Sequence, residues 1–495
     1  MSNMDVVFVE PNSAGESYQE LANDYAAIET PTWALLLAQS CRSKGYNVDI
    51  LDANAERLNA YDVAERVNDL SPNLCLFVVY GQNPNSGTVN MAGALKEARA
   101  IKEMYPDTLI GVVGSYSSAL PRKVMEYECV DVVFTNEGVY ALHNLLSQLR
   151  LDDPDLGKVN GIGWRSRNRD TRWILNKPER LVPSDRMDED LPGYAWDLLP
   201  YNKKPFDLYR AHFWHANYES NRTPFAAIYT SLGCRFQCNF CMINILNRIN
   251  NDEDSVSSDF NVMRFWSPEF IIKEFDKLAE YGVKNVRISD EMFFLTKKYF
   301  DPLLDLLIER DHKFNMWAYS RIDTCNEKFL EKFKKAGINW LALGIEAANR
   351  NVRLEITKGK FADVDIKNVV DKIHDSGIKI VANYMLGFPT ENFSNMEETV
   401  ELCKDLNCEF NNIYCAAALP GSPLYKEAKA AGWELPDTFE GFGFYSYECL
   451  PLPTHHLTAE EFLSYREDCW RDIHTSSKLL DMIEDKFGIE QRKNI

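Results

Sequence analysis

The sequence contains no long hydrophobic run. A membrane-spanning helix needs about 18 to 20 apolar residues in succession, and the longest apolar stretches here, such as residues 74–80, have only the length of a strand. The chain begins with Met-Ser-Asn-Met-Asp and enters the apolar segment 6–9 directly, which leaves no room for a signal peptide. We therefore expect a cytoplasmic protein with no membrane partner.

Positive charge is scarce. The chain has 54 Lys and Arg residues against 74 Asp and Glu residues, which gives a formal net charge of −20. Such a surface repels phosphate backbones, so we expect a small-molecule substrate rather than nucleic acid. Nucleotide-binding signals are missing too, because no G-x-G-x-x-G follows the first predicted strand and no P-loop occurs. A dinucleotide or a nucleoside triphosphate is therefore disfavoured.

The apolar residues that are present form short strands that alternate with helical stretches over residues 1–150. This alternation predicts right-handed βαβ units in a parallel, doubly wound α/β sheet. Five strands fit the flavodoxin-like variant, whose ligand crevice lies at the carboxyl ends of the strands. Helices are expected at 31–44 and 91–104. The expected strands are residues 6–9, 48–51, 74–79, 109–113 and 130–134.

Residues 151–222 interrupt the alternation and are predicted to form an ordered connector with a small hairpin at 157–164. The alternation resumes over residues 223–430 with six expected strands, which are too few for a closed eightfold barrel, so we expect a partial barrel. These strands are residues 226–230, 285–289, 314–319, 340–345, 378–385 and 413–417. Residues 431–495, rich in aromatic residues and then helical from Thr458, are expected to cap the open side or to line a pocket.

Three cysteines stand within eight residues directly after the first strand of the predicted barrel. Cys234, Cys238 and Cys241 have the spacing C-x3-C-x2-C, and the next cysteine is Cys325. A [4Fe-4S] cluster normally takes four thiolates. Three ligands leave one iron open to a chelating amine and carboxylate, which the amino acid end of methionine offers. Phe240, just before the third cysteine, is placed to cover an adenine ring.

Two simpler interpretations of these cysteines exist. One is a structural zinc site with His212 or His215 as the fourth ligand, although zinc prefers paired C-x-x-C motifs or Cys/His knuckles. The other is three cysteines in the core without a metal. The position of the motif at the carboxyl end of the first barrel strand, which is the active-site face of such barrels, favours the cluster.

With this motif the sequence resembles the radical S-adenosylmethionine (SAM) superfamily, whose signature is this cysteine motif on the first strand of a partial barrel. Further segments match the motifs of the superfamily in order at successive strand ends. They are Ser289-Asp290-Glu291, Ser320-Arg321, Gly344-Ile345-Glu346, the segment 384–389 and the segment 420–425.

The resemblance implies a role for each of these segments in SAM binding. Asp290 and Glu291 would contact the amino group of SAM. The ribose or the carboxylate would be contacted by Ser320, Arg321 and Glu346, and backbone groups around Gly387 would meet the adenine. Each segment alone has the alternative of being an ordinary surface loop, and the order of the segments carries the comparison.

The layout of the whole chain is similar to that of cobalamin (B12)-dependent radical SAM proteins. Within the first domain, the segments 113–118 and 135–138 resemble the third and fourth loops of the B12-binding fold, which implies cobalamin contacts from Gly114, Ser115, Glu137 and Gly138. The usual Gly-Gly-x-His and Gly-Glu-Gly-Glu motifs are altered here, and D-x-H-x-x-G is absent. The domain therefore either binds cobalamin without a histidine ligand to cobalt or serves only as a dimer or docking surface.

The resemblance implies an enzyme that reductively cleaves SAM to a 5′-deoxyadenosyl radical. With cobalamin present, it favours C-methylation of an unactivated carbon, with electrons from a donor such as flavodoxin or ferredoxin. A B12-dependent radical cyclase or oxidase is the nearest alternative. A non-catalytic metal-binding scaffold is an alternative of a different class. The sequence assigns no catalytic side chain and does not identify the substrate.

Overall fold

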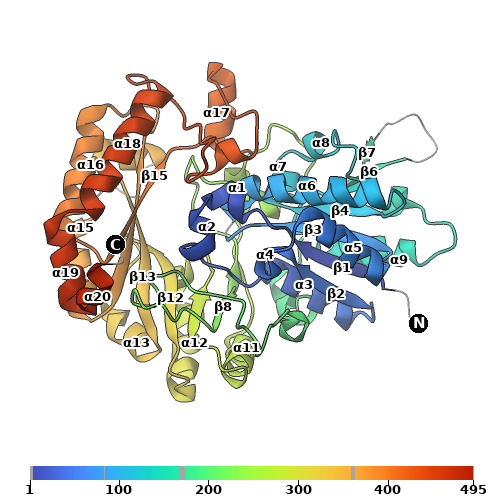
Figure 1. The fold of residues 1–495 in the computed structure, drawn as a ribbon, viewed down its shortest axis with the longest axis horizontal. Helices are drawn as coiled ribbons and strands as arrows, with labels where there is room; N and C mark the ends of the chain where they lie inside the picture. The colour runs from blue at the N-terminus through green and yellow to red at the C-terminus, as the bar shows by residue number, and fades with distance from the viewer. Residues whose placement is uncertain (1–3, 83, 167–172, 358–362, 494–495) are drawn as a thin grey trace.

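Two parallel β-sheets with helices against them organise the chain, one in the N-terminal half and one in the C-terminal half (Figure 1). The structure is a computed structural model that describes residues 4–82, 84–166, 173–357 and 363–493. In that part of the chain, no helix combines the length and the apolar character needed to cross a membrane.

The first sheet has the expected flavodoxin-like order. Its parallel strands lie in the order β2-β1-β3-β4-β5, which confirms the prediction of a doubly wound sheet. The strands are β1 (Val6–Glu10), β2 (Val48–Asp52), β3 (Leu74–Val79), β4 (Ile110–Gly114) and β5 (Val132–Phe134). Helices cover both faces of the sheet, so its central strands are apolar on both sides rather than alternating.

Side chains of alternate residues in β1 enter two separate cores. Val6 and Phe8 pack with α3 (Thr32–Ser43) and α9 (Val139–Leu149). Val7 and Val9 pack with α5 (Ala60–Leu70) and α6 (Gly87–Met104). Helix α6 begins four residues earlier than the sequence pattern indicates.

Two antiparallel strands extend this sheet beyond β5. They are β6 (Ile162–Arg165) and β7 (Trp173–Leu175), and they pair with each other. The hairpin predicted at 157–164 is therefore wrong. The side-chain nitrogen of Asn176 donates to the carbonyl groups of Leu156 and Val159, each at 2.7 Å, so the segment before β6 is held by the chain that follows β7.

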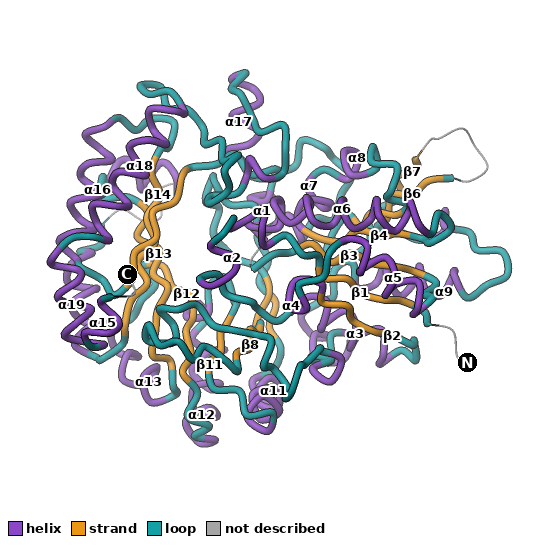
Figure 2. The backbone as a smooth tube through the Cα atoms, in the orientation of Figure 1, coloured by secondary structure: helices purple, strands orange, loops and turns teal. Residues whose placement is uncertain are grey.

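The second sheet is a partial barrel of six parallel strands, as predicted. Its order is β15-β14-β13-β12-β11-β8, so the two edges are not joined. The strands are β8 (Phe225–Ile228), β11 (Asn285–Ile288), β12 (Asn315–Arg321), β13 (Ile338–Glu346), β14 (Lys379–Leu386) and β15 (Phe410–Cys415). Figure 2 shows these strands enclosed by an outer layer of helices. That layer comprises α11 (Pro268–Glu280), α12 (Lys297–Arg310), α13 (Leu330–Lys335), α15 (Ile366–Asp375) and α16 (Phe393–Leu406).

The two edges of the partial barrel are covered by different parts of the chain. At β8, the hydroxyl group of Thr30 accepts from the amide of Ala227 at 2.9 Å and donates to its carbonyl at 3.1 Å. At β15, the C-terminal helix α18 (Ala459–His474) packs against the strand and against α16. Thr458 caps α18, as its position in the sequence indicates.

Candidate active site

A cavity of about 740 Å³ lies at the carboxyl ends of both sheets and continues into the partial barrel. In the first half, its wall includes Glu10, the last residue of β1, and Tyr80, which directly follows β3. The barrel contributes residues of β12 to β15, and all three cysteines of the C-x3-C-x2-C motif line the same cavity. The structure therefore places the predicted cluster ligands where the two halves meet.

Each of the three cysteine sulfurs has a nitrogen donor within hydrogen-bonding reach. The contacts run from the Phe236 amide to Cys234 Sγ (3.4 Å), from the Arg321 guanidinium to Cys238 Sγ (3.9 Å) and from the Asn85 side chain to Cys241 Sγ (3.8 Å). Burial raises the pKa of the free Cys234 thiol to about 12 and that of Cys238 to about 11. N–H donors favour the thiolate form and tune the potential of bound clusters, so this sulfur set fits an iron–sulfur cluster.

The described residues contain no group of three or more His, Cys, Asp or Glu side chains arranged to hold a single metal ion. A four-iron cluster does not need such convergence, because its cysteines bind different irons. His212 pairs with Glu29 at 3.5 Å, and His215 Nε2 lies 2.8 Å from the carbonyl of Asn315, at the amino end of β12. Neither histidine contacts the cysteine loop in these interactions, so the geometry does not support the zinc alternative.

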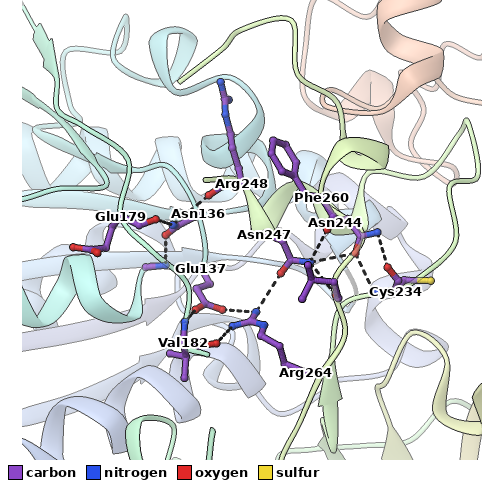
Figure 3. A network of polar contacts seen from close by, with 12 residues as sticks. Asn136, Glu137, Glu179, Val182, Cys234, Asn244, Asn247, Arg248, Phe260 and Arg264 are labelled. Atoms are coloured by element: carbon purple, nitrogen blue, oxygen red, sulfur yellow. Dashed lines mark hydrogen bonds and ion pairs between the residues drawn. The ribbon is translucent and has the colours of Figure 1, made fainter. Parts of the chain in front are cut away.

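The first cysteine is held by a side-chain amide. Asn244 Oδ1 accepts from the backbone N–H of Cys234, and Asn244 Nδ2 donates to its carbonyl, both at 2.9 Å. Asn247 donates to Asn244 Oδ1 at 3.3 Å and accepts from Arg264 at 3.2 Å. Figure 3 shows this series of contacts running from the cysteine loop toward the N-terminal half.

The series ends on a residue that the sequence assigned to cobalamin. Arg264 forms an ion pair with Glu137 at 2.6 Å, and both side chains are almost fully buried (Figure 3). The second carboxylate oxygen of Glu137 accepts from the amide of Val182 at 2.7 Å. Glu137 therefore joins the first sheet to the barrel and does not line the cavity.

Asp290 has a similar supporting position beneath the cysteine loop. It is fully buried, and it accepts hydrogen bonds from the hydroxyl groups of Thr230 (2.7 Å) and Ser231 (2.5 Å), which precede the motif. Burial raises its pKa to about 6, although these bonds oppose the shift. Asp290 does not line the cavity, whereas Glu291 does. Burial raises the pKa of Glu291 to about 8 against the attraction of Arg287.

The carboxyl ends of β12 and β13 bring a cation and an acid together on the cavity wall. The Arg321 guanidinium bonds Asp323 and stacks 3.6 Å above the centre of the Phe236 ring. Glu346 follows a bulge in β13 and has a backbone φ of +65°, a strained conformation for a residue with a side chain. Burial raises the pKa of Glu346 to about 7. Strained residues cluster at functional sites, and this one faces the cavity.

Of the other residues predicted to contact SAM, Phe240 and Ser320 line the cavity and Gly387 does not. Gly387 has φ of +82°, and a Cβ atom there would lie 2.3 Å from the ring of Phe462 in α18. The glycine is therefore required by the close approach of the C-terminal helix. The SAM contacts of all these residues remain predictions.

The predicted cobalamin residues Gly114, Ser115 and Gly138 lie away from the cavity wall, as Glu137 does. The 3-10 turn Ile243–Asn247 packs over this part of the first sheet. The segments that follow β1 and β3 face the cavity instead. Their polar residues are Glu10 at the end of β1, Ser13, Gln82, Asn85 and Ser86 in the connections, and Asn90 in the first turn of α6. These groups suit the amide-rich edge of a corrin, and the carboxyl end of the sheet is the ligand crevice of this fold. Their position directly after strands was the sequence signal that could have identified them.

Comparison with known proteins agrees with both halves of the structure. The profile of the Radical SAM superfamily matches residues 228–403, and that of the B12 binding domain matches residues 21–146. A protein of Pyrococcus horikoshii named as an uncharacterized methyltransferase is 26% identical over 406 residues, which cover 81% of this chain and 79% of the relative. The anaerobic magnesium-protoporphyrin IX monomethyl ester cyclase of Rubrivivax gelatinosus is 24% identical and covers 90% of this chain and 72% of its own.

Among solved structures, the radical SAM methyltransferase TsrM from Kitasatospora setae superimposes with a TM-score of 0.67. It is 16% identical, and the alignment covers 94% of this chain and 88% of TsrM, so the likeness shows a shared fold. Two matching domain profiles, in the order that the fold shows, agree with the cysteine motif and the cavity. Residues 228–403 therefore form a radical SAM domain, and residues 21–146 form a B12-binding domain ahead of it.

Proposed function

We propose that the protein is a cobalamin-dependent radical SAM enzyme that methylates an unactivated carbon of a small molecule. The observation that carries the proposal is the set of three cysteines, each with a nitrogen donor to sulfur, on the wall of a cavity shared by the B12-binding half and the barrel. A scaffold protein has no need for a cavity that both cofactors could share.

Cys234, Cys238 and Cys241 would hold the cluster, and the loops after β1 and β3 would hold cobalamin. When bound, the cluster supplies the electron that cleaves SAM to methionine and a 5′-deoxyadenosyl radical, and cobalamin supplies a carrier for a methyl group. The protein provides binding, orientation and the exclusion of water.

The residues of the cavity wall divide these tasks. Arg321 offers the cation for the SAM carboxylate and also contacts Cys238 Sγ, so it would hold SAM against the cluster side of the cavity. Glu291 and Glu346 offer carboxyl groups for the amino group and the ribose. Their raised pKa values mean that a cation entering the site would favour release of their protons.

The choice of methyl transfer rests on relatives named as methyltransferases, including the one from Pyrococcus horikoshii and TsrM. A radical cyclase or oxidase is the second candidate, because the cyclase of Rubrivivax gelatinosus matches over 90% of this chain. Either reaction needs single electrons, and we propose a small electron carrier such as flavodoxin or ferredoxin as the donor.

The test uses anaerobically purified and reconstituted protein. The wild type should contain about four irons and four sulfides, bind a corrin and form 5′-deoxyadenosine from SAM. Cys238→Ala should lose the cluster absorbance and deoxyadenosine formation, while Cys325→Ala, which alters a cysteine outside the cavity wall, should keep both. Transfer of a deuterated methyl group from SAM to product separates methylation from cyclisation. Zinc near one per chain without sulfide would refute the proposal.

A further inference from the structure

The interior of the partial barrel is built in layers that can be read from the strand register. Residues two apart on one strand point to the same side. The inward residues of β12 to β15 line the cavity from the layer of Ala342 and Val381 upward, whereas Trp340 and Lys379, one layer below, do not. Glu346 lies at the upper end, after the bulge in β13. Below it, Arg321, Gly344, Asn383 and Asn412 pair in register across the four strands and form the middle layer. The next layer consists of Tyr319, Ala342, Val381 and Phe410.

Small residues keep the centre of these layers open. Gly344 and Ala342 stand on β13 where larger side chains would fill a closed barrel, and aromatic rings form the surrounding wall. Trp317 and Trp214 close the bottom, with their ring centres 5.2 Å apart. The chamber below Glu346 is therefore largely apolar and has flat walls.

Besides Arg321, two side-chain amides supply the polarity of the middle layer. Asn412 donates to Asn383 Oδ1 at 3.0 Å, and Asn383 donates to the carbonyl of Val381 at 3.3 Å. The Tyr445 hydroxyl makes a longer contact of 3.5 Å to Asn412 Oδ1. A side-chain amide has two N–H groups, and these contacts use one N–H group on each nitrogen and one lone pair on each oxygen. The remaining N–H groups can serve a hydrogen-bond acceptor on a ligand.

The charges of the chamber wall do not suit an anion. Among the described residues that line the cavity, Arg321 is the only Arg or Lys, and it is paired with Asp323. The acids on the wall include Glu10, Glu29 and Glu291. Arg287, which lies behind the wall, is fully buried and forms an ion pair with Glu29. A bound anion would lose its hydration without gaining a cation that is not already paired.

We propose that this chamber binds a substrate with a flat, largely apolar body, one hydrogen-bond acceptor directed at Asn383 and Asn412, and no negative charge. The inference rests on the proposed function, since it takes the chamber below Glu346 as the substrate site. It excludes phosphorylated and carboxylated substrates from this part of the cavity.

The experiment measures the binding of probes to the reconstituted, full-length protein by equilibrium dialysis, with SAM and cobalamin added. The probes are naphthalene-2-carboxamide, 2-naphthoate and 2-naphthylmethylammonium, which share a ring system and differ in charge. We expect the carboxamide and the ammonium probe to bind, and the naphthoate to bind at least about tenfold more weakly, because a buried unpaired charge is costly. Naphthoate binding as tight as carboxamide binding, or no binding of any probe, would overturn the inference.

Variants locate the site. Asn412→Leu should weaken carboxamide binding about fivefold, which corresponds to one lost hydrogen bond, and leave the binding of 2-ethylnaphthalene unchanged. Asn412→Asp should strengthen binding of the ammonium probe and weaken the naphthoate further. If neither variant changes the ranking of the probes, the inference is wrong. The result does not depend on turnover: probe binding with no deoxyadenosine formation would reject the proposed function, and SAM cleavage without probe binding would reject the chamber alone.

Discussion

Asn85 allows a direct test of how the N-terminal half acts on the cluster. Its side-chain nitrogen lies 3.8 Å from Cys241 Sγ, and its oxygen accepts from the amide of Met242 at 3.0 Å. An N–H donor to a ligating sulfur stabilises the reduced, more negative cluster more than the oxidised one. Asn85→Leu keeps the volume of the side chain and removes the donor, so the reduction potential of the cluster should become more negative.

The size of the shift follows from the strength of the bond. A net hydrogen bond contributes about 0.5–1.5 kcal/mol, and a one-electron couple changes by about 59 mV for a tenfold change in its equilibrium constant. The expected shift is therefore about 20–65 mV. The assay is a redox titration of reconstituted protein followed by electron paramagnetic resonance.

The control for this variant is Asn90→Leu. Asn90 lines the same cavity from the same helical region, and no side-chain bond joins it to the cysteine loop in the described structure. Its substitution should leave the potential within about 10 mV of the wild type, well below the shift expected from a lost hydrogen bond. An Asn85→Leu protein with full iron content and an unchanged potential would refute the idea that this contact tunes the cluster.

Three further predictions concern stability. Glu137→Gln breaks a buried ion pair and should destabilise the protein by about 3–5 kcal/mol, seen as a lower urea midpoint, and adding Arg264→Met should recover part of the loss. If the double variant is no more stable than the single one, the pair does not act as a unit. Burial raises the pKa of Glu291 from 4.5 to about 8, so the unfolded chain releases this proton at lower pH than the folded protein, and stability should fall as pH rises from about 5 to about 8. Glu291→Gln should flatten that fall in melting temperature, and an unchanged slope would contradict the assignment. Gly387→Ala should cost about 1–3 kcal/mol because of contact with Phe462, and Phe462→Leu in the same chain should restore part of the melting temperature unless the contact is unimportant.

The sequence predicted both sheets because their strands are apolar runs separated by helical stretches of regular length. It also identified the cysteine loop, since three thiols at fixed spacing after a strand allow few chemistries. It gave no indication that Glu137 would point away from the cavity toward Arg264. The sequence does not distinguish an acid in a loop that lines a cavity from one that forms a buried ion pair. The partner lies 127 residues further along the chain, and such a pairing depends on how the two halves pack.

The same limit applies to Asn85 and Asn244. Both are single amides with no motif around them, and their importance comes from the backbone and sulfur groups that the fold brings near. Asn383 and Asn412 were closer to being predictable. Asn383 lies within the predicted strand 378–385, and a polar residue in the middle of a buried strand indicates an inward-facing position that needs a partner. Asn412 lies one residue before the predicted strand 413–417, because β15 begins at Phe410.

Inside the barrel, the residues that set the width of the chamber lie at a different height from Glu346, which is predicted to bind SAM. Because Ala342 and Val381 set the width of the layer below Arg321, replacing either one with a residue of slightly different size would change the width of the chamber while leaving Arg321 and Glu346 in place. Relatives with this barrel can thus differ in the substrates that they bind through a few changes in side-chain volume. The residues predicted to bind SAM and the cluster can stay the same.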